Sequence, residues 1–244
     1  MLLRKSQGRM NKDYEWVSKC LRGIARALVA VILLPFYRPK ATGNLKGPKT
    51  EGCILIANHH SLLDPILMTY FFKSTRLNFV AKAELFRIPV IGRFLRAFHS
   101  IPLDRNAADI KASKMILSEI KTGKIVGIFL QGTRVKLAEA AKEQPHASIL
   151  YYAIRRGIPV IHVSIDPRYH LFGRPRFLFG DPVRYLVNDK VAFDKTEQDK
   201  VAREVMRLIY ERAGLSYLYD GWEENRLFYN QRIKVVPLSE RESL

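Results

Sequence analysis

The residues of this sequence best suited to chemistry lie together in residues 58–64, which read NHHSLLD. A histidine whose ring is oriented by a carboxylate can act as a general base with a fixed tautomer. His59 and Asp64 are of the right types, but on a single helix their spacing would turn them to different faces. A loop that carries His59, followed by a helix that begins near Asp64, can bring the two side chains together.

The elements that must position this pair are visible on either side of it. Residues 53–57 (CILIA) form an apolar run of strand length, and in an α/β sheet the loop after a strand is where functional residues collect. Ser61 with Asp64 three residues later is similar to a capping box, which predicts a helix that begins at Leu62. Two interpretations stay open for these residues alone. Either Asp64 orients His59 as a general base, or Asp64 only caps the helix and His59 is an ordinary loop histidine.

Apolar runs of strand length alternate with helical patterns through most of the remaining chain. The predicted strands cover residues 53–57, 77–81, 125–130 and 160–165, and a predicted edge strand covers 176–179. The predicted helices cover residues 61–72, 89–98, 107–121, 147–156 and 196–212. This alternation predicts an α/β fold with a mostly parallel sheet flanked by helices. The end of the chain gives no clear pattern.

The chain divides into an N-terminal segment, residues 1–40, and an α/β domain, residues 41–244. The polar residues 40–50 (KATGNLKGPKT) predict a linker with turns between the two. No cleavable secretory signal is evident, because more than twenty residues precede the apolar stretch and no small-residue cleavage pattern follows it.

The N-terminal segment is predicted to be a membrane anchor. Residues 27–37 (ALVAVILLPFY) supply only about half of the ~20 apolar residues that a spanning helix requires. Before them, Lys19, Arg22 and Arg26 recur at helical spacing beside apolar residues, which is typical of a basic amphipathic helix in a headgroup layer. A terminal helix packed on the domain is the alternative, and a re-entrant pair of helices is a variant of the anchor.

The composition adds a constraint on partners. The 244 residues include 41 Lys and Arg against 23 Asp and Glu, which gives a net charge of +18 and favours anionic partners. The basic residues are scattered and no nucleic-acid-binding module is present, so nucleic acid is not expected. The two cysteines, Cys20 and Cys53, are far apart without companion ligands, so neither a metal site nor a disulfide is expected, and a cytosolic location follows.

Residues 58–64 resemble the NHxSxxD signature, an HxxxxD motif, of the glycerophospholipid acyltransferase family, which includes the lysophosphatidic acid acyltransferases. Three later blocks resemble that family in the same order, over residues 81–105, 129–134 (FLQGTR) and 157–165 (GIPVIHVSI). The third block is usually FPEGTR in the family, so Gln131 stands where a glutamate is usual. Together the blocks extend from about residue 50 to residue 165.

Lys82, Arg105 and Arg134 each follow a strand-like run, so they are expected near one end of the sheet. The resemblance implies that these residues bind the phosphate of the acceptor lipid. Solvated surface charge is the alternative for all three. Gly132 and Thr133 predict a tight turn whose N–H groups can approach an anion, and Pro159 is expected to shape the start of a strand rather than to touch the chemistry.

The resemblance implies a catalytic role for His59 and Asp64, with Asn58, Ser61 and Gln131 as supporting residues of the motifs. The implied reaction transfers an acyl chain from acyl-CoA or an acyl carrier protein to the sn-2 hydroxyl of 1-acyl-glycerol-3-phosphate. No cofactor beyond this co-substrate is expected. The expected location is the cytoplasmic face of an anionic membrane, as a monotopic or peripheral protein. Another lysolipid acceptor, such as an ornithine lipid, and a non-catalytic lipid-binding relative are the alternatives.

Overall fold

A computed structural model of the chain describes residues 23–24, 26–27, 29–74, 76–104, 110–188 and 192–238. Most of the predicted amphipathic anchor helix lies outside the described residues, and so does Arg105. The predicted division at residue 40 therefore stays a prediction.

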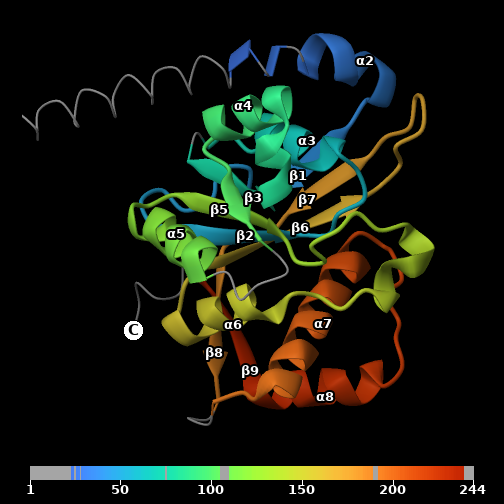
Figure 1. Cartoon of the computed structure of the whole chain (residues 1–244). Helices are drawn as coiled ribbons and strands as arrows, with labels where there is room; N and C mark the ends of the chain where they lie inside the picture. Colours follow the sequence, from blue (N-terminus) through green and yellow to red (C-terminus); the bar gives the residue numbers. More distant parts are fainter. Residues whose placement is uncertain are drawn as a thin grey trace, which may run out of the picture.

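The fold is built on a mixed sheet whose central strands are parallel (Figure 1). The strand order is β1-β7-β6-β2-β5-β3-β4, and β8 and β9 extend the sheet beside β6. β6, β2, β5, β3 and β4 run parallel, whereas β7 is antiparallel to β6. The strands are β1 Lys40–Gly43, β2 Cys53–Ala57, β3 Leu77–Lys82, β4 Ile101–Leu103, β5 Ile125–Phe129, β6 Val160–Asp166, β7 Arg176–Phe179, β8 Val183–Val187 and β9 Ile233–Pro237.

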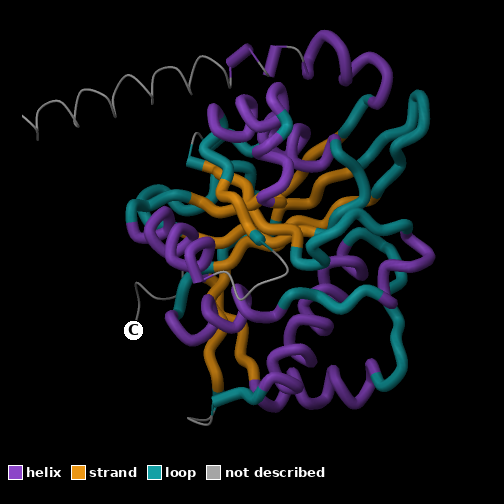
Figure 2. The backbone as a smooth tube through the Cα atoms, viewed as in Figure 1, coloured by secondary structure: helices purple, strands orange, loops and turns teal. Residues whose placement is uncertain are grey.

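Helices cover both faces of the sheet (Figure 2). Two sets lie on opposite sides: η1, α2 and α3 pack on one face, and α5, α6, α7 and α8 pack on the other. The helices are η1 Val29–Leu33, α2 Leu34–Tyr37, α3 Leu63–Phe71, η2 Ala83–Arg87, α4 Pro89–Ala97, α5 Ile110–Lys121, η3 Leu137–Lys142, α6 Ala147–Arg156, α7 Lys195–Arg212 and α8 Trp222–Arg232.

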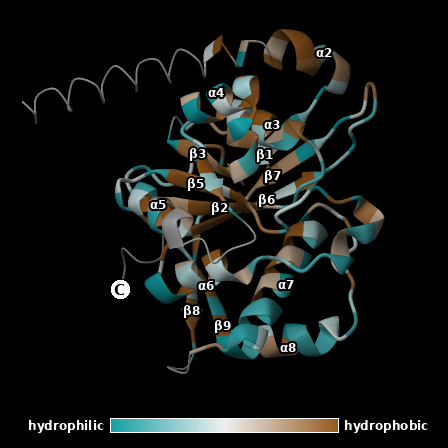
Figure 3. Cartoon of the chain, in the orientation of Figure 1, coloured by the Kyte–Doolittle hydropathy of each residue, from teal (hydrophilic) through white to brown (hydrophobic). Residues whose placement is uncertain are grey.

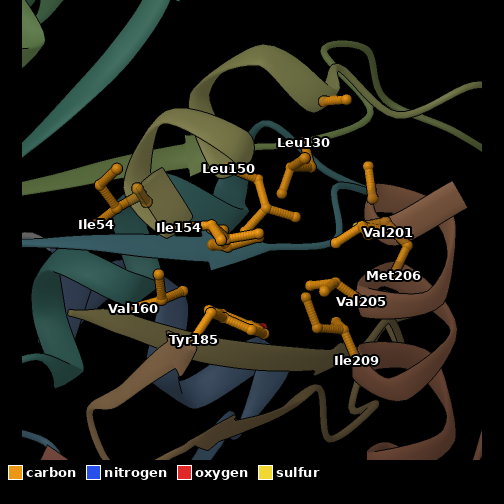
Figure 4. Close-up of a cluster of buried hydrophobic side chains, with 14 of the residues drawn as sticks. Ile54, Leu130, Leu150, Ile154, Val160, Tyr185, Val201, Val205, Met206 and Ile209 are labelled. Carbon is orange, nitrogen blue, oxygen red and sulfur yellow. The ribbon is translucent and has the colours of Figure 1, made fainter. Parts of the chain in front are cut away.

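Strand β2 shows why the sheet needs helices on both faces. All five of its residues are buried, and alternate side chains belong to two separate apolar clusters. Ile54 and Ile56 point into the cluster formed with α6 and α7, which Figure 4 shows around Leu150 and Val205. Cys53, Leu55 and Ala57 point into the cluster under α3. A strand buried on both faces reads as a continuous apolar run, as CILIA does.

The structure confirms the predicted α/β fold, adds the unpredicted strands β4 and β8, and corrects three further points. The predicted linker, residues 40–50, contains β1, whose polar residues pair with β7 through their backbone and therefore carry no apolar signal. The strand at 176–179 is not an edge strand, because β1 lies outside it. The end of the chain, where no pattern was found, holds α8 and β9.

The described part of the N-terminal segment contacts the domain. Val29 is buried beside α3, and Arg26 donates from Nη2 to the carbonyl oxygens of Thr69 and Phe72 at 3.4 and 3.3 Å. Val31 and Phe36 are exposed. Among the described residues, none of the helices has both the length and the apolar character needed to cross a membrane.

A half-buried histidine in the sheet makes the stability of this fold depend on pH. Removal of His162, in β6, from water disfavours its charged form, and the nearby Arg212 guanidinium repels that charge. Together they lower the pKa of His162 from 6.5 to about 4. Because the unfolded chain then takes up a proton first, the free energy of unfolding should be fully retained above pH 6.5 and fall as the pH drops towards 4. The loss should be on the order of 2–3 kcal/mol. Thermal unfolding of the wild type and of His162→Gln over this range measures it.

His170 is exposed and provides the matched control. His170→Gln should keep the wild-type pH dependence of the melting temperature, while His162→Gln should flatten it. An unchanged pH dependence in His162→Gln would contradict this assignment.

Candidate active site

The segment 58–64 follows the carboxyl end of β2, and Asn58 bonds it to β6, the neighbouring strand in the sheet. This side chain is fully buried, its Oδ1 accepts from Ile165 N and its Nδ2 donates to Ile165 O, both at 2.8 Å. The amide therefore continues the hydrogen bonding between β2 and β6 past the last backbone pair, Ala57 with Val163. Asn58 is a positioning residue for the loop that follows.

His60 is the second tie of this loop. Its Nδ1 is 2.9 Å from the Val135 carbonyl oxygen and so donates to it, and its Nε2 is 3.0 Å from Asn58 Nδ2 and so accepts from it. Burial lowers the pKa of His60, which keeps the ring neutral in this arrangement. With both ring nitrogens bonded, His60 is held as a structural group.

His59 and Asp64 are brought together, with Nδ1 of the histidine 2.9 Å from Oδ2 of the aspartate. The same Oδ2 accepts from the backbone N–H groups of His60 at 2.7 Å and Ser61 at 2.8 Å. Asp64 lies in the first turn of α3, so its carboxylate holds the turn before the helix and orients His59 at once. Ser61 contributes its Oγ, which accepts from Leu63 N at 3.1 Å.

The hydrogen bonds fix the tautomer of His59. A carboxylate only accepts, so the proton lies on Nδ1 and Nε2 is left with a free lone pair. Asp64 is fully buried, and the side chain of His59 is 15% exposed. The His59 side chain therefore keeps a small exposed surface while that of Asp64 is shielded from water.

The ring of His59 is also held by stacking. It lies on Phe129 with ring centroids 3.9 Å apart, and Phe129 stacks in turn on Phe79 at 5.7 Å. Gly127 makes room for this stack, since a Cβ there would lie 2.5 Å from the Phe79 ring. Aromatic stacking limits the rotation of the imidazole and places it at the end of β5.

Gln131 fills a buried position behind the pair. Its Oε1 accepts from His59 N at 3.4 Å and from the Tyr210 hydroxyl at 3.1 Å, and its Nε2 donates to Ala140 O at 3.2 Å. The amide is needed as both an acceptor and a donor, which a glutamate cannot be while ionised. Glutamine therefore suits the immediate surroundings of this position.

Gly132 forms the predicted tight turn, with φ of +69°. Its N–H donates to Phe129 O at 2.9 Å, so this group is used within the turn and is not free to hold an anion, contrary to the expectation. Thr133 is exposed beyond the turn. Pro159 precedes β6 at the opposite end of the sheet, where its carbonyl accepts from Ile54 N at 2.9 Å, in keeping with a role in strand pairing alone.

Two of the three predicted phosphate-binding residues lie at the same edge of the sheet as His59. Lys82 ends β3, and Arg134 follows β5 in the loop that also contains Gln131. Both are exposed, and Lys82 forms an exposed ion pair with Glu84 at 3.1 Å. Because these strands are parallel, their carboxyl ends meet at one edge. Arg105, which would follow β4 there, lies outside the described residues.

In the parts of the chain that are described, no group of three or more His, Cys, Asp or Glu side chains is arranged to hold a metal ion.

The family model named Acyltransferase matches residues 38–166, more than half of the chain. The chain belongs to the Acyltransferase family. The match begins just before β1 and ends with β6, so it spans the strands that carry the His59–Asp64 pair, Lys82 and Arg134.

Relatives and a solved structure agree with this membership. A protein of Bacillus subtilis named 1-acyl-sn-glycerol-3-phosphate acyltransferase is 33% identical over 138 residues, 56% of this chain and 69% of the relative. The chloroplastic 1-acyl-sn-glycerol-3-phosphate acyltransferase BAT2 of Brassica napus is 28% identical over 58% of this chain and 41% of its own. The crystal structure of the 1-acyl-sn-glycerophosphate acyltransferase PlsC from Thermotoga maritima shares the fold, with a TM-score of 0.59, 23% identity and coverage of 84% and 83% of the two chains.

The site of this acyltransferase contains one residue that the sequence motifs missed. Tyr169 lies three residues beyond β6, outside the family match, and its hydroxyl donates a short hydrogen bond to Asp64 Oδ1. Burial, helped by the Asp64 carboxylate, raises the pKa of Tyr169 above its ordinary range, so the hydroxyl keeps its proton and remains a donor. The only available signal was its place after a parallel strand.

Replacing Tyr169 by Phe should lower turnover while leaving the fold intact. The buried carboxylate loses a donor, which costs roughly 1–3 kcal/mol and loosens the orientation of His59. We expect acyl transfer to fall about tenfold in kcat with little change in KM, and its dependence on pH to shift. Steady-state kinetics from pH 6 to pH 9 measure both. Tyr37→Phe is the matched control, because the Tyr37 ring meets the Tyr169 ring edge-on. An equal loss of kcat in Tyr37→Phe would contradict the role assigned to the Tyr169 hydroxyl.

Gln131→Glu should destabilise this chain at neutral pH, although glutamate is the usual family residue. A carboxylate there loses the bond to Ala140 O and faces that carbonyl with a negative oxygen, which costs roughly 1–3 kcal/mol. Thermal unfolding should show the deficit at pH 7 and a smaller one at pH 5, where protonation restores a donor. Gln144→Glu changes an exposed glutamine beside Arg203 and should not destabilise. Equal melting temperatures of wild type and Gln131→Glu at pH 7 would refute the argument.

Proposed function

We propose that this protein transfers a fatty acyl group from an acyl thioester to the free sn-2 hydroxyl of 1-acyl-glycerol-3-phosphate, giving phosphatidic acid. The names of the relatives from Bacillus subtilis and Brassica napus support this acceptor. The observation that carries the proposal is the His59–Asp64 pair at the carboxyl edge of the sheet, with Nδ1 2.9 Å from Oδ2, which leaves the lone pair on Nε2 to act as the base.

In the proposed reaction, His59 Nε2 takes the proton of the acceptor hydroxyl as the hydroxyl oxygen attacks the thioester carbonyl carbon. The carbon–sulfur bond then breaks, and the departing thiolate receives the proton from Nε2. The products are an ester and a free thiol, without a covalent acyl-enzyme. Asp64 stays ionised throughout and stabilises the imidazolium that forms between the two steps.

The acceptor phosphate is assigned to the basic residues around the pair. Lys82 and Arg134 lie at the same sheet edge, and the exposed ion pair of Lys82 with Glu84 is too weak to withhold the ammonium from a phosphate. Arg134 makes no ion pair within the described residues, so its guanidinium is free to bind phosphate in a forked manner. Arg105 completes the proposed set.

The donor is acyl-CoA or an acyl carrier protein, and no further cofactor is proposed. Both donors are anionic, and a chain with a net charge of +18 attracts either one. The acceptor is a membrane lipid, so the proposed place of action is the cytoplasmic face of an anionic membrane. Gln131 gives no ground for a different acceptor, because it is buried behind the pair and its hydrogen bonds are made within the protein.

His59→Ala should abolish acyl transfer without loss of fold. Removal of a general base costs about 10²–10⁴-fold in kcat. The assay incubates the protein with an acyl thioester and a panel of lysolipids, follows free thiol, and identifies the products by mass spectrometry. Thiol release by the wild type should require lysophosphatidic acid.

The exposed His170 supplies the control, since His170→Ala removes an imidazole that does not contact Asp64. Its turnover of a short-chain, water-soluble lysophosphatidic acid should equal that of the wild type. Near-normal turnover of His59→Ala would refute the catalytic role of the pair. A preference of the wild type for lyso-ornithine lipid would refute the proposed acceptor.

A further inference from the structure

Helix α4 turns its apolar side chains away from the protein. Val90, Ile91 and Phe94 share one face of the helix and are 78%, 42% and 47% exposed. A helix on the surface of a globular protein ordinarily turns such a face inward. Here only Gly92 is buried within α4.

The outward orientation of α4 is fixed by its contact with η2. A Cβ on Gly92 would lie 2.2 Å from the Phe86 carbonyl oxygen, so only glycine allows the helix to approach this closely. Arg96 Nη1 donates to the same carbonyl at 3.0 Å. The exposed apolar face is therefore a built feature of the fold.

A second exposed apolar group lies on the same side of the molecule. Val31 on η1 is 73% exposed, and Leu171 and Phe172 in the loop after β6 are 62% and 59% exposed. The loop is tied to α2, because Phe172 N donates to Phe36 O at 2.7 Å. In Figure 1, α2, α4 and this loop all lie above the sheet, and Figure 3 shows the strongly apolar character of α2.

These exposed apolar residues lie close in the chain to residues of the active site. α4 is separated from Lys82 only by η2, and Leu171 and Phe172 lie in the loop whose Tyr169 binds Asp64. Leu62, at the start of α3 beside the pair, is 63% exposed. Any surface that covered these apolar residues would therefore also contact the edge of the active site.

The charges of the segments that carry these apolar residues indicate what kind of partner would bind them. Residues 26–50, 85–103 and 167–180 contain no Asp or Glu at all, while each segment carries several Arg or Lys. Three exposed arginines lie here, Arg87 at the end of η2 and Arg93 and Arg96 in α4. Apolar side chains with arginines and no acids match an anionic headgroup layer above hydrocarbon. A second copy of the chain would bring the same positive charge and repel.

We propose that α4, together with η1, α2 and the loop 167–175, is a docking surface for an anionic lipid bilayer, into which Val90, Ile91 and Phe94 insert. The surface shares η1 and α2 with the predicted N-terminal anchor and adds α4 and the loop 167–175 to it. Its role is to hold the His59–Asp64 pair at the depth of lipid headgroups. It rests on the proposed function only for the identity of the acceptor that it presents.

The first experiment reads the environment of residue 90 directly. Val90→Cys is made in a Cys20→Ser background and labelled with an environment-sensitive fluorophore. Cys53 is buried, which raises the pKa of its thiol to about 12 and keeps it unreactive. Phosphatidylcholine vesicles with phosphatidylglycerol should shift the emission to the blue and expose the label to a quencher on the acyl chains.

Leu227→Cys on α8 is the matched control, since Leu227 is as exposed as Leu171 but lies on the other side of the sheet. Its label should not respond. The proposal is overturned if residue 90 stays in water while the protein co-sediments with the vesicles. It is also overturned if the shift occurs without vesicles as the protein concentration rises, because that result indicates self-association.

The second experiment separates docking from chemistry. The double variant Val90→Gln with Phe94→Gln should lower turnover of vesicle-embedded lysophosphatidic acid about tenfold or more, because two inserted side chains are lost. It should leave turnover of a short-chain, water-soluble lysophosphatidic acid unchanged. Equal turnover of both substrates by wild type and variant would refute docking. Failure of the proposed function would instead leave the wild type inactive on both while residue 90 still inserts.

Discussion

A carboxylate that is removed from water needs donors for its charge, and Asp64 has four of them. Its Oδ2 accepts from His59 Nδ1 and from the backbone of His60 and Ser61, and its Oδ1 accepts from Tyr169. An unsatisfied buried charge costs several kcal/mol, so the loop after β2 and the loop after β6 must take conformations that supply these donors. The orientation of the imidazole is thus a consequence of solvating one buried charge. Holding the turn before α3 and aligning the base are a single requirement.

The sheet makes that requirement possible by bringing separate loops to one edge. β2, β5 and β3 are parallel neighbours, so the residues that follow them meet although they are far apart in the chain. Both faces of β2 are packed, which fixes the end of the strand that carries Asn58 and His59. On β5, Gly127 admits the Phe79 ring, whose stack with Phe129 reaches the imidazole. A glycine in the middle of a strand, ordinarily a weakness, here serves the site.

Local pattern was enough to predict β2, the loop and α3, and it allowed His59 to lie close to Asp64, because all of these depend on neighbours in sequence. It was not enough for Tyr169, which reaches Asp64 from 105 residues away, or for Tyr210, which bonds Gln131 from 79 residues away. β1 was taken for a linker because its pairing uses only backbone groups. The helix 89–98 was predicted, but its orientation was not, since an apolar stripe does not by itself say whether protein or lipid covers it. The part of the predicted anchor before residue 23 lies outside the described residues.

The positive charge of the chain is unevenly placed, and this bears on what the charge is for. The acidic residues are frequent on α7 and α8, where Glu197, Glu204 and Glu211 bond to arginines, and absent from residues 85–103 and 167–180. Charge alone would attract any polyanion, nucleic acid included. Exposed Val90 and Phe94 beside the arginines add a requirement for hydrocarbon beneath the anionic layer, which only a lipid surface meets. A docked face would also leave α7 and α8 towards water, so a soluble donor would approach the pair from the sheet edge while the acceptor came from the bilayer.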